Sequence, residues 1–377
     1  MRILQLGKAQ PPIKGLGGVE KVIQSYYYGL NSINISCDVL GVNDKFKYKI
    51  DNYINDGLVF REKLFLHLNS TFLSFHLIFR LIRIHNKYDI IHVHHPDPMS
   101  FLALLFIKFK GKLVIHWHSD IIRQKYIYKF YKYVENCILK KSDLILCTSP
   151  NYYTKNPVLS EFLNKTKYLP IGLDLNTLKI NEDLYNSLKS NDTNSFKIIF
   201  IGRLVGYKGL KYLIKAFSSL NHQFELNIVG DGPLLLEMKN LVNELKLDNQ
   251  VNFLGNINDE DKYSYLKYSD ILVLPSISRN EAYGIAQIEA MAFGKPVIST
   301  KIHRSGVDWV NDDGKTGFVV PIQDSKALSI SINKLFIEKD TYKVLSKNCF
   351  KKFNDMFIHK NIVMDLNFLY NDLLNNK

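Results

Sequence analysis

Cysteine is scarce in this chain, and its placement argues against two kinds of site. Four cysteines occur in 377 residues, at Cys37, Cys137, Cys147 and Cys349, and no two of them form a CxxC pair. This spacing argues against a disulfide framework and against a cysteine zinc site. It fits a protein of the reducing cytoplasm, which is the compartment that we expect.

Long apolar runs are also lacking. No run reaches the length of about eighteen uncharged apolar residues that a membrane-spanning helix needs, and the nearest one, 64–79, is interrupted by histidine, asparagine and serine. The opening residues, MRILQLGKAQPP, carry too short an apolar run for a signal peptide and predict a β-strand. We therefore predict no membrane span.

Acidic residues are few in the first half of the chain. Residues 1–180 contain 25 Lys and Arg against 13 Asp and Glu, whereas the remaining residues contain 24 against 23. The formal net charge of +13 thus lies almost entirely in the first half. Such asymmetry predicts an anionic partner, either a membrane surface or a nucleic acid. No recognised nucleic-acid-binding module accompanies the charge, so we expect no nucleic-acid partner.

The length is too great for one ordinary core and suits two α/β domains. Apolar strands alternate with helical patterns in both halves, and no internal repeat or low-complexity tract occurs. We predict a first domain over residues 1–180 and a second over 196–354. The polar run 181–195 is the expected linker. Residues 355–377 have helical spacing.

Two segments of the first half combine apolar and basic residues. Segment 122–141 places four lysines on one helical stripe (Lys125, Lys129, Lys132, Lys140) and aromatic or apolar residues on the next (Tyr126, Phe130, Tyr133, Cys137). This pattern is typical of an interfacial helix on anionic lipid, and a solvated face explains it equally well. Segment 61–87 predicts a core helix; exposure of its Phe and Leu residues would instead make it membrane-seeking.

Four histidines alternate on two predicted strands, at His92, His94, His116 and His118. A zinc site is conceivable, but the period of two on parallel strands explains the spacing without metal. HExxH and Cys/His ligand spacings are absent, so we expect no metal. His118 differs from the others because it lies past the carboxyl end of its strand, where open α/β sheets place their sites.

Two loops of the second half carry the strongest functional signal. Arg203 and Lys208 bracket the first loop, between a buried strand and a helix, so both cations and the helix terminus can converge on phosphate. The second lies in LPSISRNEAYGIAQIEAMAFGKPVIST, which begins at residue 274. There Glu281 and Glu289 stand eight positions apart around Gly284, which lets a ligand approach free backbone N–H groups. Together these parts predict a pocket for a sugar nucleotide.

The segment EAYGIAQIEAMAFGKPVI, with Glu281-x7-Glu289, closely resembles the signature of the retaining family 4 glycosyltransferases. The loop around Arg203 and Lys208 resembles the family's G-R-L-x-x-x-K-G pattern. The resemblance implies the α/β GT-B fold, in which two Rossmann-like, doubly wound parallel-sheet domains face each other across a cleft. The last helix of such proteins, here from about residue 355, returns to the first domain. The resemblance is densest over 196–321 and thinner over 1–180.

The resemblance also implies roles for individual residues. Glu289 would hold the ribose, Glu281 and His118 would orient the donor sugar, and Arg203 and Lys208 would stabilise the leaving diphosphate. The remaining implied donor-binding positions act through backbone or close approach: Gly17 and Gly18 in a glycine-rich loop, Gly255 at the base, and Tyr283 with Gly284 at the diphosphate. The glycine spacing at 15–18 does not fit a dinucleotide fingerprint.

The expected function is hexosyl transfer, with retention, from a nucleotide sugar to a lipid-linked or oligosaccharide acceptor in surface polysaccharide biosynthesis of the O-antigen or capsule type. GDP-mannose is the first choice of donor and UDP-hexoses are the next. We expect no cofactor besides this co-substrate, and a cytoplasmic protein peripheral to the inner face of the membrane through 122–141. Two alternatives remain open: a sugar-nucleotide epimerase of the same fold, and a non-catalytic sugar-nucleotide-binding subunit.

Overall fold

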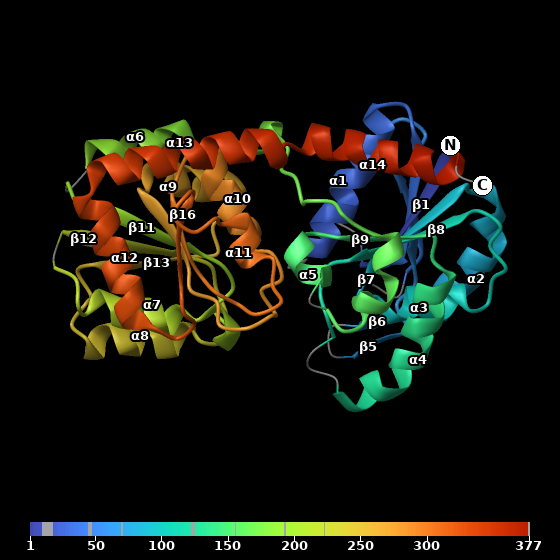
Figure 1. Cartoon of the computed structure of the whole chain (residues 1–377), viewed down its shortest axis with the longest axis horizontal. Helices are drawn as coiled ribbons and strands as arrows, with labels where there is room; N and C mark the ends of the chain where they lie inside the picture. Colours follow the sequence, from blue (N-terminus) through green and yellow to red (C-terminus); the bar gives the residue numbers. More distant parts are fainter. Residues whose placement is uncertain are drawn as a thin grey trace. The chain divides into compact units, whose positions relative to one another are not determined.

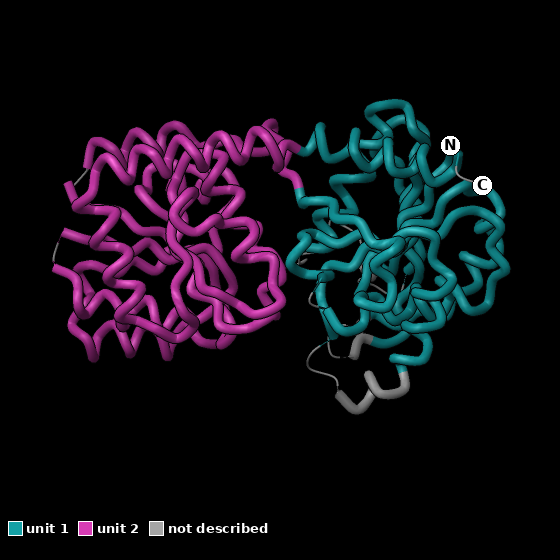
Figure 2. The backbone as a smooth tube through the Cα atoms, viewed as in Figure 1, with its two compact units in different colours: residues 1–171, 359–377 teal, residues 172–358 magenta. Residues whose placement is uncertain are grey.

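The structure is a computed structural model that describes residues 1–9, 18–43, 47–68, 71–121, 125–154, 156–191, 194–221 and 223–375. The chain forms two compact units (Figure 2). Unit 1 comprises Met1–Ile171 and His359–Lys377, and unit 2 comprises Gly172–Ile358. The first boundary therefore lies before the predicted domain end at residue 180, so residues 172–180 belong to unit 2.

Unit 1 is built on an eight-stranded sheet in the order β10-β9-β8-β7-β1-β2-β4-β3, in which only β3 runs antiparallel to its neighbour. Strand β7 is buried along its whole length, and β1 and β2 are buried beyond their first residues wherever their side chains are described, as in parallel sheets covered on both faces. The strands are β1 (Arg2–Ala9), β2 (Ser36–Val42), β3 (Lys49–Asn52), β4 (Leu58–Glu62), β7 (Ile90–His95), β8 (Lys112–Trp117), β9 (Leu144–Cys147) and β10 (Thr166–Tyr168).

The last helix, α14 (His359–Asn375), belongs to unit 1 and packs along α1 (Gly18–Ser32) (Figure 1). Its Tyr370 is fully buried against the sheet histidine His92. Elsewhere in the unit, α3 packs against both α2 and α4. The other described helices of the unit are α2 (Phe75–Ile84), η1 (His85–Lys87), α3 (Pro98–Leu104), α4 (Lys125–Lys141), α5 (Pro150–Thr154) and η2 (Leu159–Lys165).

The single core helix predicted over 61–87 is wrong. The segment instead contains the end of β4, a small antiparallel pair of β5 (Leu66–Leu68) and β6 (Thr71–Leu73), α2 and η1. Helix α2 starts late because the Ser74 hydroxyl accepts from the backbone N–H of Leu77 and caps it. The prediction of apolar packing holds for one face only, where Leu77 and Leu81 are buried.

The linker predicted over 181–195 is also wrong in most of its length. Residues Glu182–Ser190 form α6, which packs on α9 (Asp259–Tyr268) within unit 2. Asn181 caps α6 by accepting from Leu184 N at 3.2 Å, and its amide donates to Asp261 Oδ1 at 2.8 Å. The polar residues that suggested a linker thus serve as a helix cap and as a docking contact.

Unit 2 is built on a six-stranded parallel sheet in the order β13-β12-β11-β14-β15-β16. Helices α7, α8 and α12 group on one face, and α9, α10 and α13 on the other (Figure 1). Its strands are β11 (Phe196–Ile201), β12 (Phe224–Val229), β13 (Val251–Gly255), β14 (Ile271–Leu274), β15 (Val297–Thr300) and β16 (Gly317–Val320). Its other elements are η3 (Leu175–Thr177), η4 (Gly206–Lys208), α7 (Leu210–Phe217), α8 (Leu235–Glu244), α10 (Ile285–Ala292), α11 (Val307–Val310), α12 (Ser325–Ile337) and α13 (Lys339–Met356).

The strand order of unit 2 reverses between β11 and β14. From β11 the chain moves outward to β12 and β13, and from β14 it moves the other way to β15 and β16. Open α/β sheets bind ligands at such a switch point, beyond the carboxyl ends of the strands. The predicted fold class, two Rossmann-like doubly wound parallel-sheet domains, is confirmed. None of the described helices is long and apolar enough to cross a membrane.

Candidate functional site

The two loops at the switch point of unit 2 lie in direct contact. The loop after β11 meets the loop after β14 where Ile277 N donates to Tyr207 O at 2.8 Å. Gly209 makes this approach possible: its φ is +68°, and a Cβ atom there would lie 2.0 Å from Pro275 O. Only glycine adopts this conformation without strain and leaves that space free. The sequence signals at 202–209 and 274–284 therefore belong to one site.

Lys208 and Glu281 form an ion pair at the centre of this site. Lys208 Nζ lies 2.6 Å from Glu281 Oε2, and the side chains are only 13% and 10% exposed. Ser276 Oγ donates to the same carboxylate oxygen at 2.9 Å. Burial lowers the pKa of Lys208, but the Glu281 carboxylate, together with Tyr207 and Glu289, raises it, and the net pKa is raised. Lys208 therefore carries its charge, already balanced by Glu281.

Arg203 is the cation that the loop leaves available. Its side chain is exposed, and no described residue provides a hydrogen bond or ion pair to its guanidinium. The predicted pair of phosphate-binding cations is thus unequal, because Lys208 is neutralised by Glu281 whereas Arg203 is not. A planar guanidinium is well suited to bidentate contact with a phosphate.

Glu289 lies inside α10 and is held by two residues of α9 that the sequence did not point to. Its Oε1 accepts from Lys262 Nζ at 3.0 Å and from Tyr263 Oη at 3.3 Å. Burial lowers the pKa of Lys262, but the Glu289 carboxylate, together with Tyr263 and Asp259, raises it, and the net pKa is raised. The second oxygens of Glu289 and Glu281 have no partner in the described part of the chain. Both carboxylates can therefore accept further hydrogen bonds.

Gly284 caps the start of α10 with a φ of +77°. A Cβ atom there would lie 2.6 Å from Leu274 Cδ2 at the end of β14, so glycine is required. The neighbouring Tyr283 ring is buried and packs near Trp309 and Phe357, with centroids 6.2 and 6.5 Å apart. This packing leaves the backbone as the part of Tyr283 that can face a ligand. Gly255 ends β13, and a Cβ atom added there would have no described neighbour within 4 Å.

In unit 1, His118 directly follows β8 and lies at the carboxyl edge of the sheet. Its backbone N–H donates to His95 O at 3.0 Å, and its Nε2 lies 2.8 Å from His94 Nδ1. Burial, and then the charge of neighbouring His95, lowers the pKa of His118 to about 3, so the ring is neutral. Of the glycine-rich loop, Gly17 lies outside the described residues and Gly18 begins α1.

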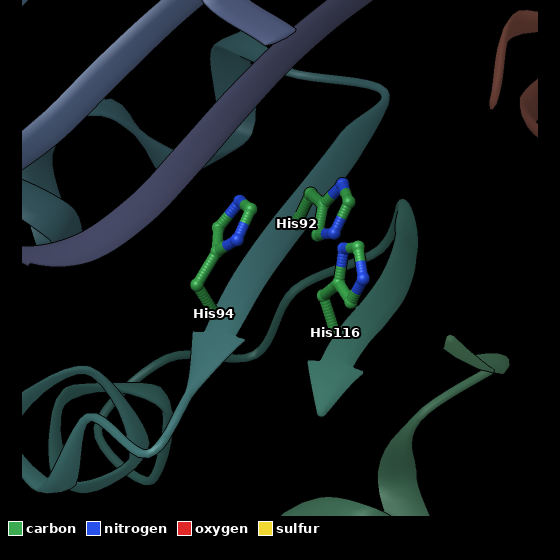
Figure 3. Close-up of side chains that lie close together, drawn as sticks. All are labelled: His92, His94 and His116. Atoms are coloured by element: carbon green, nitrogen blue, oxygen red, sulfur yellow. The ribbon is translucent and has the colours of Figure 1, made fainter. Parts of the chain in front are cut away.

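Three histidines of β7 and β8 project close together (Figure 3): His92, His94 and His116. Each offers a ligand atom within 4.8 Å of the others, and all three are buried. Both ring nitrogens of His116 and Nε2 of His92 lack partners among the described residues, but His94 uses both of its nitrogens in hydrogen bonds. A zinc site with three protein ligands would therefore have to break one of those bonds. The absence of a metal stays a prediction.

Comparison with known proteins finds two matching family models. The model described as glycosyl transferases group 1 matches residues 185–352, and the model described as glycosyltransferase family 4 matches residues 16–160. The first match covers the loops of Arg203, Lys208, Glu281 and Glu289. The second covers the part of unit 1 that holds His118.

Individual proteins agree with these models. The O-antigen chain mannosyltransferase C of Escherichia coli is 30% identical over 377 residues, covering 100% of both chains. The D-rhamnosyltransferase WbpZ of Pseudomonas aeruginosa is 29% identical over 364 residues, covering 95% of this chain and 92% of its own. Among solved structures, Anabaena HepE in complex with UDP superposes with a TM-score of 0.77 at 20% identity, covering 99% of this chain and 100% of its own.

Proposed function

Because this chain belongs to the family 4 glycosyltransferases of the GT-B fold, we propose that it transfers a hexosyl group from a nucleotide sugar to a lipid-linked or oligosaccharide acceptor in surface polysaccharide synthesis, with retention of anomeric configuration. The observation that carries this proposal is the joint placement of Lys208, Glu281 and the start of α10 at one switch point. Glu289 lies farther along the same helix, with one oxygen ready for ribose hydroxyls.

The charges of the site suit departure of a diphosphate. Leaving-group charge grows as the glycosidic bond breaks, and fixed cations or N–H dipoles aimed at that charge lower the barrier. Arg203 is unpaired in the described part of the chain, so its positive charge is available to an anion. The N–H groups at the start of α10 offer partial positive charge to an anion as well. In this proposal Lys208 orients Glu281 toward the donor sugar. Its own charge stabilises the diphosphate less than Arg203 does, because Glu281 already balances it.

GDP-mannose is the proposed donor. Two curated relatives are named for mannosyl and D-rhamnosyl transfer, which supports a mannose-type group ahead of other hexoses. UDP-hexoses are the next choice, and a structural neighbour of the same fold holds UDP. The leaving phosphate can take the proton of the acceptor hydroxyl, since the described site shows no separate base next to Glu281. No metal takes part in this scheme.

The proposed acceptor lies on an anionic membrane, and two exposed surfaces of unit 1 support this. On α2, Phe75, Phe79 and Ile82 are exposed at helical spacing, with Phe79 63% exposed. Exposed basic residues lie at its end: Arg83 in the last turn of α2 and Lys87 in the following η1. An exposed apolar stripe beside cations is typical of an interfacial helix on anionic lipid.

The second surface is α4, the helix of segment 122–141. Tyr133 is 79% exposed, and Lys132, Lys140 and Lys141 are exposed as well. The side chains at 122–130, which include Lys125, Tyr126, Lys129 and Phe130, lie outside the described residues. The described end of α4 agrees with a cationic face bordered by an aromatic residue, and it suits an anionic headgroup layer.

The test combines donor binding with turnover. Thermal shift against a panel of nucleotide sugars should show the largest rise in melting temperature with GDP-mannose. Transfer of labelled mannose to a lipid-diphosphate-linked oligosaccharide, with the anomeric configuration of the product read by NMR, then tests reaction and stereochemistry. Release of an epimer without acceptor would identify an epimerase instead. Tight donor binding with no turnover on any acceptor would identify a binding subunit.

A further inference from the structure

A continuous set of hydrogen bonds leads from His118 into the core of unit 1. His118 Nε2 lies 2.8 Å from His94 Nδ1, and His94 Nε2 lies 2.6 Å from Gln5 Oε1. Gln5 is on β1, His94 on the neighbouring β7, and His118 just beyond β8, so the sheet order itself brings them together. All three side chains are buried.

The Gln5 amide continues the set on its other side. Its Nε2 donates to Tyr370 Oη at 3.4 Å, and Tyr370 Oη lies 2.5 Å from His92 Nδ1. Tyr370 comes from α14, near the far end of the chain. With its NH2 group facing Tyr370, Gln5 presents only its carbonyl oxygen to His94. A carbonyl oxygen accepts hydrogen bonds and cannot donate them.

The direction of each bond follows from this acceptor. His94 must carry its proton on Nε2 in order to donate to Gln5, so its Nδ1 holds a lone pair. That lone pair requires a proton on His118 Nε2, and the second nitrogen of His118 is then unprotonated. Burial lowers the pKa of His94 well below its ordinary value, so a second proton that would break this logic is absent. The described residues provide no partner for His118 Nδ1, although that atom is buried.

We propose that Gln5 and His94 are positioning residues that hold His118 in the Nε2-protonated tautomer, so that His118 Nδ1 accepts a hydrogen bond from a hydroxyl group of the donor hexose. This inference rests on the proposed function for its substrate. A phosphate oxygen of the donor has no proton to give at neutral pH, so the lone pair at Nδ1 repels it. The hydrogen-bonded set thereby assigns His118 to a hydroxyl of the sugar and not to the diphosphate.

An unsatisfied buried nitrogen has an energetic cost that a sugar hydroxyl would remove. Leaving such a group without a partner costs the free energy of its desolvation, with no hydrogen bond to offset it. His118 Nδ1 is in this position at the carboxyl edge of the sheet, where ligands of this fold class bind. The tautomer of His118 therefore favours a ligand atom that donates a hydrogen bond.

The first experiment is NMR of the full-length protein labelled with 15N in histidine. Two-bond correlations from the ring carbons' protons distinguish a protonated from an unprotonated ring nitrogen, and His118→Gln assigns the signals. We expect His118 Nε2 protonated and Nδ1 unprotonated. The opposite tautomer in the wild-type protein would overturn the proposal, and this measurement requires no core variant to fold.

The second experiment removes the acceptor with Gln5→Leu. His94 then loses the carbonyl that fixes its proton, so the His118 signals should shift toward a mixture of tautomers. Tyr26→Phe is the matched control, because it deletes a buried hydroxyl in the same core that has no partner among the described residues. The control should leave the His118 tautomer unchanged. An unaltered His118 tautomer in Gln5→Leu, or an equal shift in Tyr26→Phe, would refute the positioning role.

Kinetics then connect the tautomer to the substrate. Gln5→Leu should lower kcat/KM for the donor by about two- to tenfold, the value of one net hydrogen bond. Among donor analogues that each lack one hydroxyl, the analogue without the contacted hydroxyl should show no such loss. An equal loss with every analogue would contradict a hydrogen bond to one hydroxyl. A protein with the expected tautomer and no glycosyl transfer would separate failure of the proposed function from failure of this inference.

Discussion

Replacing Lys208 by methionine tests the energetics of the central ion pair. The substitution keeps the length of the side chain and removes its charge, leaving the Glu281 carboxylate 10% exposed, with Ser276 as its one remaining side-chain partner among the described residues. Removing one partner of a buried pair costs about 3–5 kcal/mol, because the other charge remains desolvated. The partial exposure of this pair places the expected loss near the lower end, about 3 kcal/mol. For a unit of this size that corresponds to a fall of roughly 6–12 °C in Tm.

The two tryptophans allow the loss to be assigned to one unit. Trp117 lies in unit 1 and Trp309 in unit 2, so a Trp117→Phe background makes Trp309 fluorescence the reporter of unit 2. This separation matters because a chain of two units need not unfold in one step. Lys343→Met is the matched control, since Lys343 forms an exposed pair with Asp340 at 3.6 Å in the same unit. Exposed pairs contribute little to stability.

Two further measurements sharpen this test. The double variant Lys208→Met with Glu281→Gln removes both charges and should recover much of the lost stability. Since the pKa of Lys208 is raised above its ordinary value of 10.5, its stabilising contribution is complete below that pH and is lost as the pH rises through the raised pKa. If Lys208→Met lowered the midpoint no more than Lys343→Met, the ion-pair argument would be refuted.

The other predictions concern ligands and the chain itself. Glu289→Gln should raise the donor KM roughly tenfold or more, because a charged acceptor for ribose is lost; an unchanged KM for the nucleotide sugar would remove the ribose role. Arg203→Ala should lower kcat by about a hundredfold through lost stabilisation of the leaving phosphate, and turnover assays with intact kinetics would contradict that account. The double variant Phe75→Ser with Phe79→Ser should weaken sedimentation with phosphatidylglycerol vesicles severalfold, whereas Phe350→Ser, an exposed phenylalanine of unit 2, should not. Equal binding by the wild-type protein and both variants would exclude α2 as a membrane face. Gly209→Ala should destabilise unit 2 by more than 1 kcal/mol in the Trp309 assay, since its Cβ would meet Pro275 O; a neutral effect would mean that the loops can separate freely.

Local patterns predicted the strands and the two-domain organisation because buried parallel strands form short apolar runs between helices. The same patterns failed at 61–87 and 181–195. In the first segment, strands β5 and β6 and helix α2 all carry apolar residues, so periodicity could not separate them. In the second, a capping Asn181 and a docking surface on α9 turned a polar run into helix α6. The α9 surface lies outside the segment, so the polar run alone did not reveal it.

The sequence by itself determined which residues belong to the loops beyond β11 and β14. Glycines and carboxylates occur there at fixed spacings along the chain, and such spacings can be recognised without a structure. Tertiary structure alone decided their partners. Lys262 and Tyr263 hold Glu289 from another helix, and no motif marks them. Gln5 and Tyr370 are 365 positions apart, and they meet because α14 packs on the sheet whose central strand is β1. Hydrogen bonds depend on distances in space of about 3 Å, and only the packed sheet sets those distances.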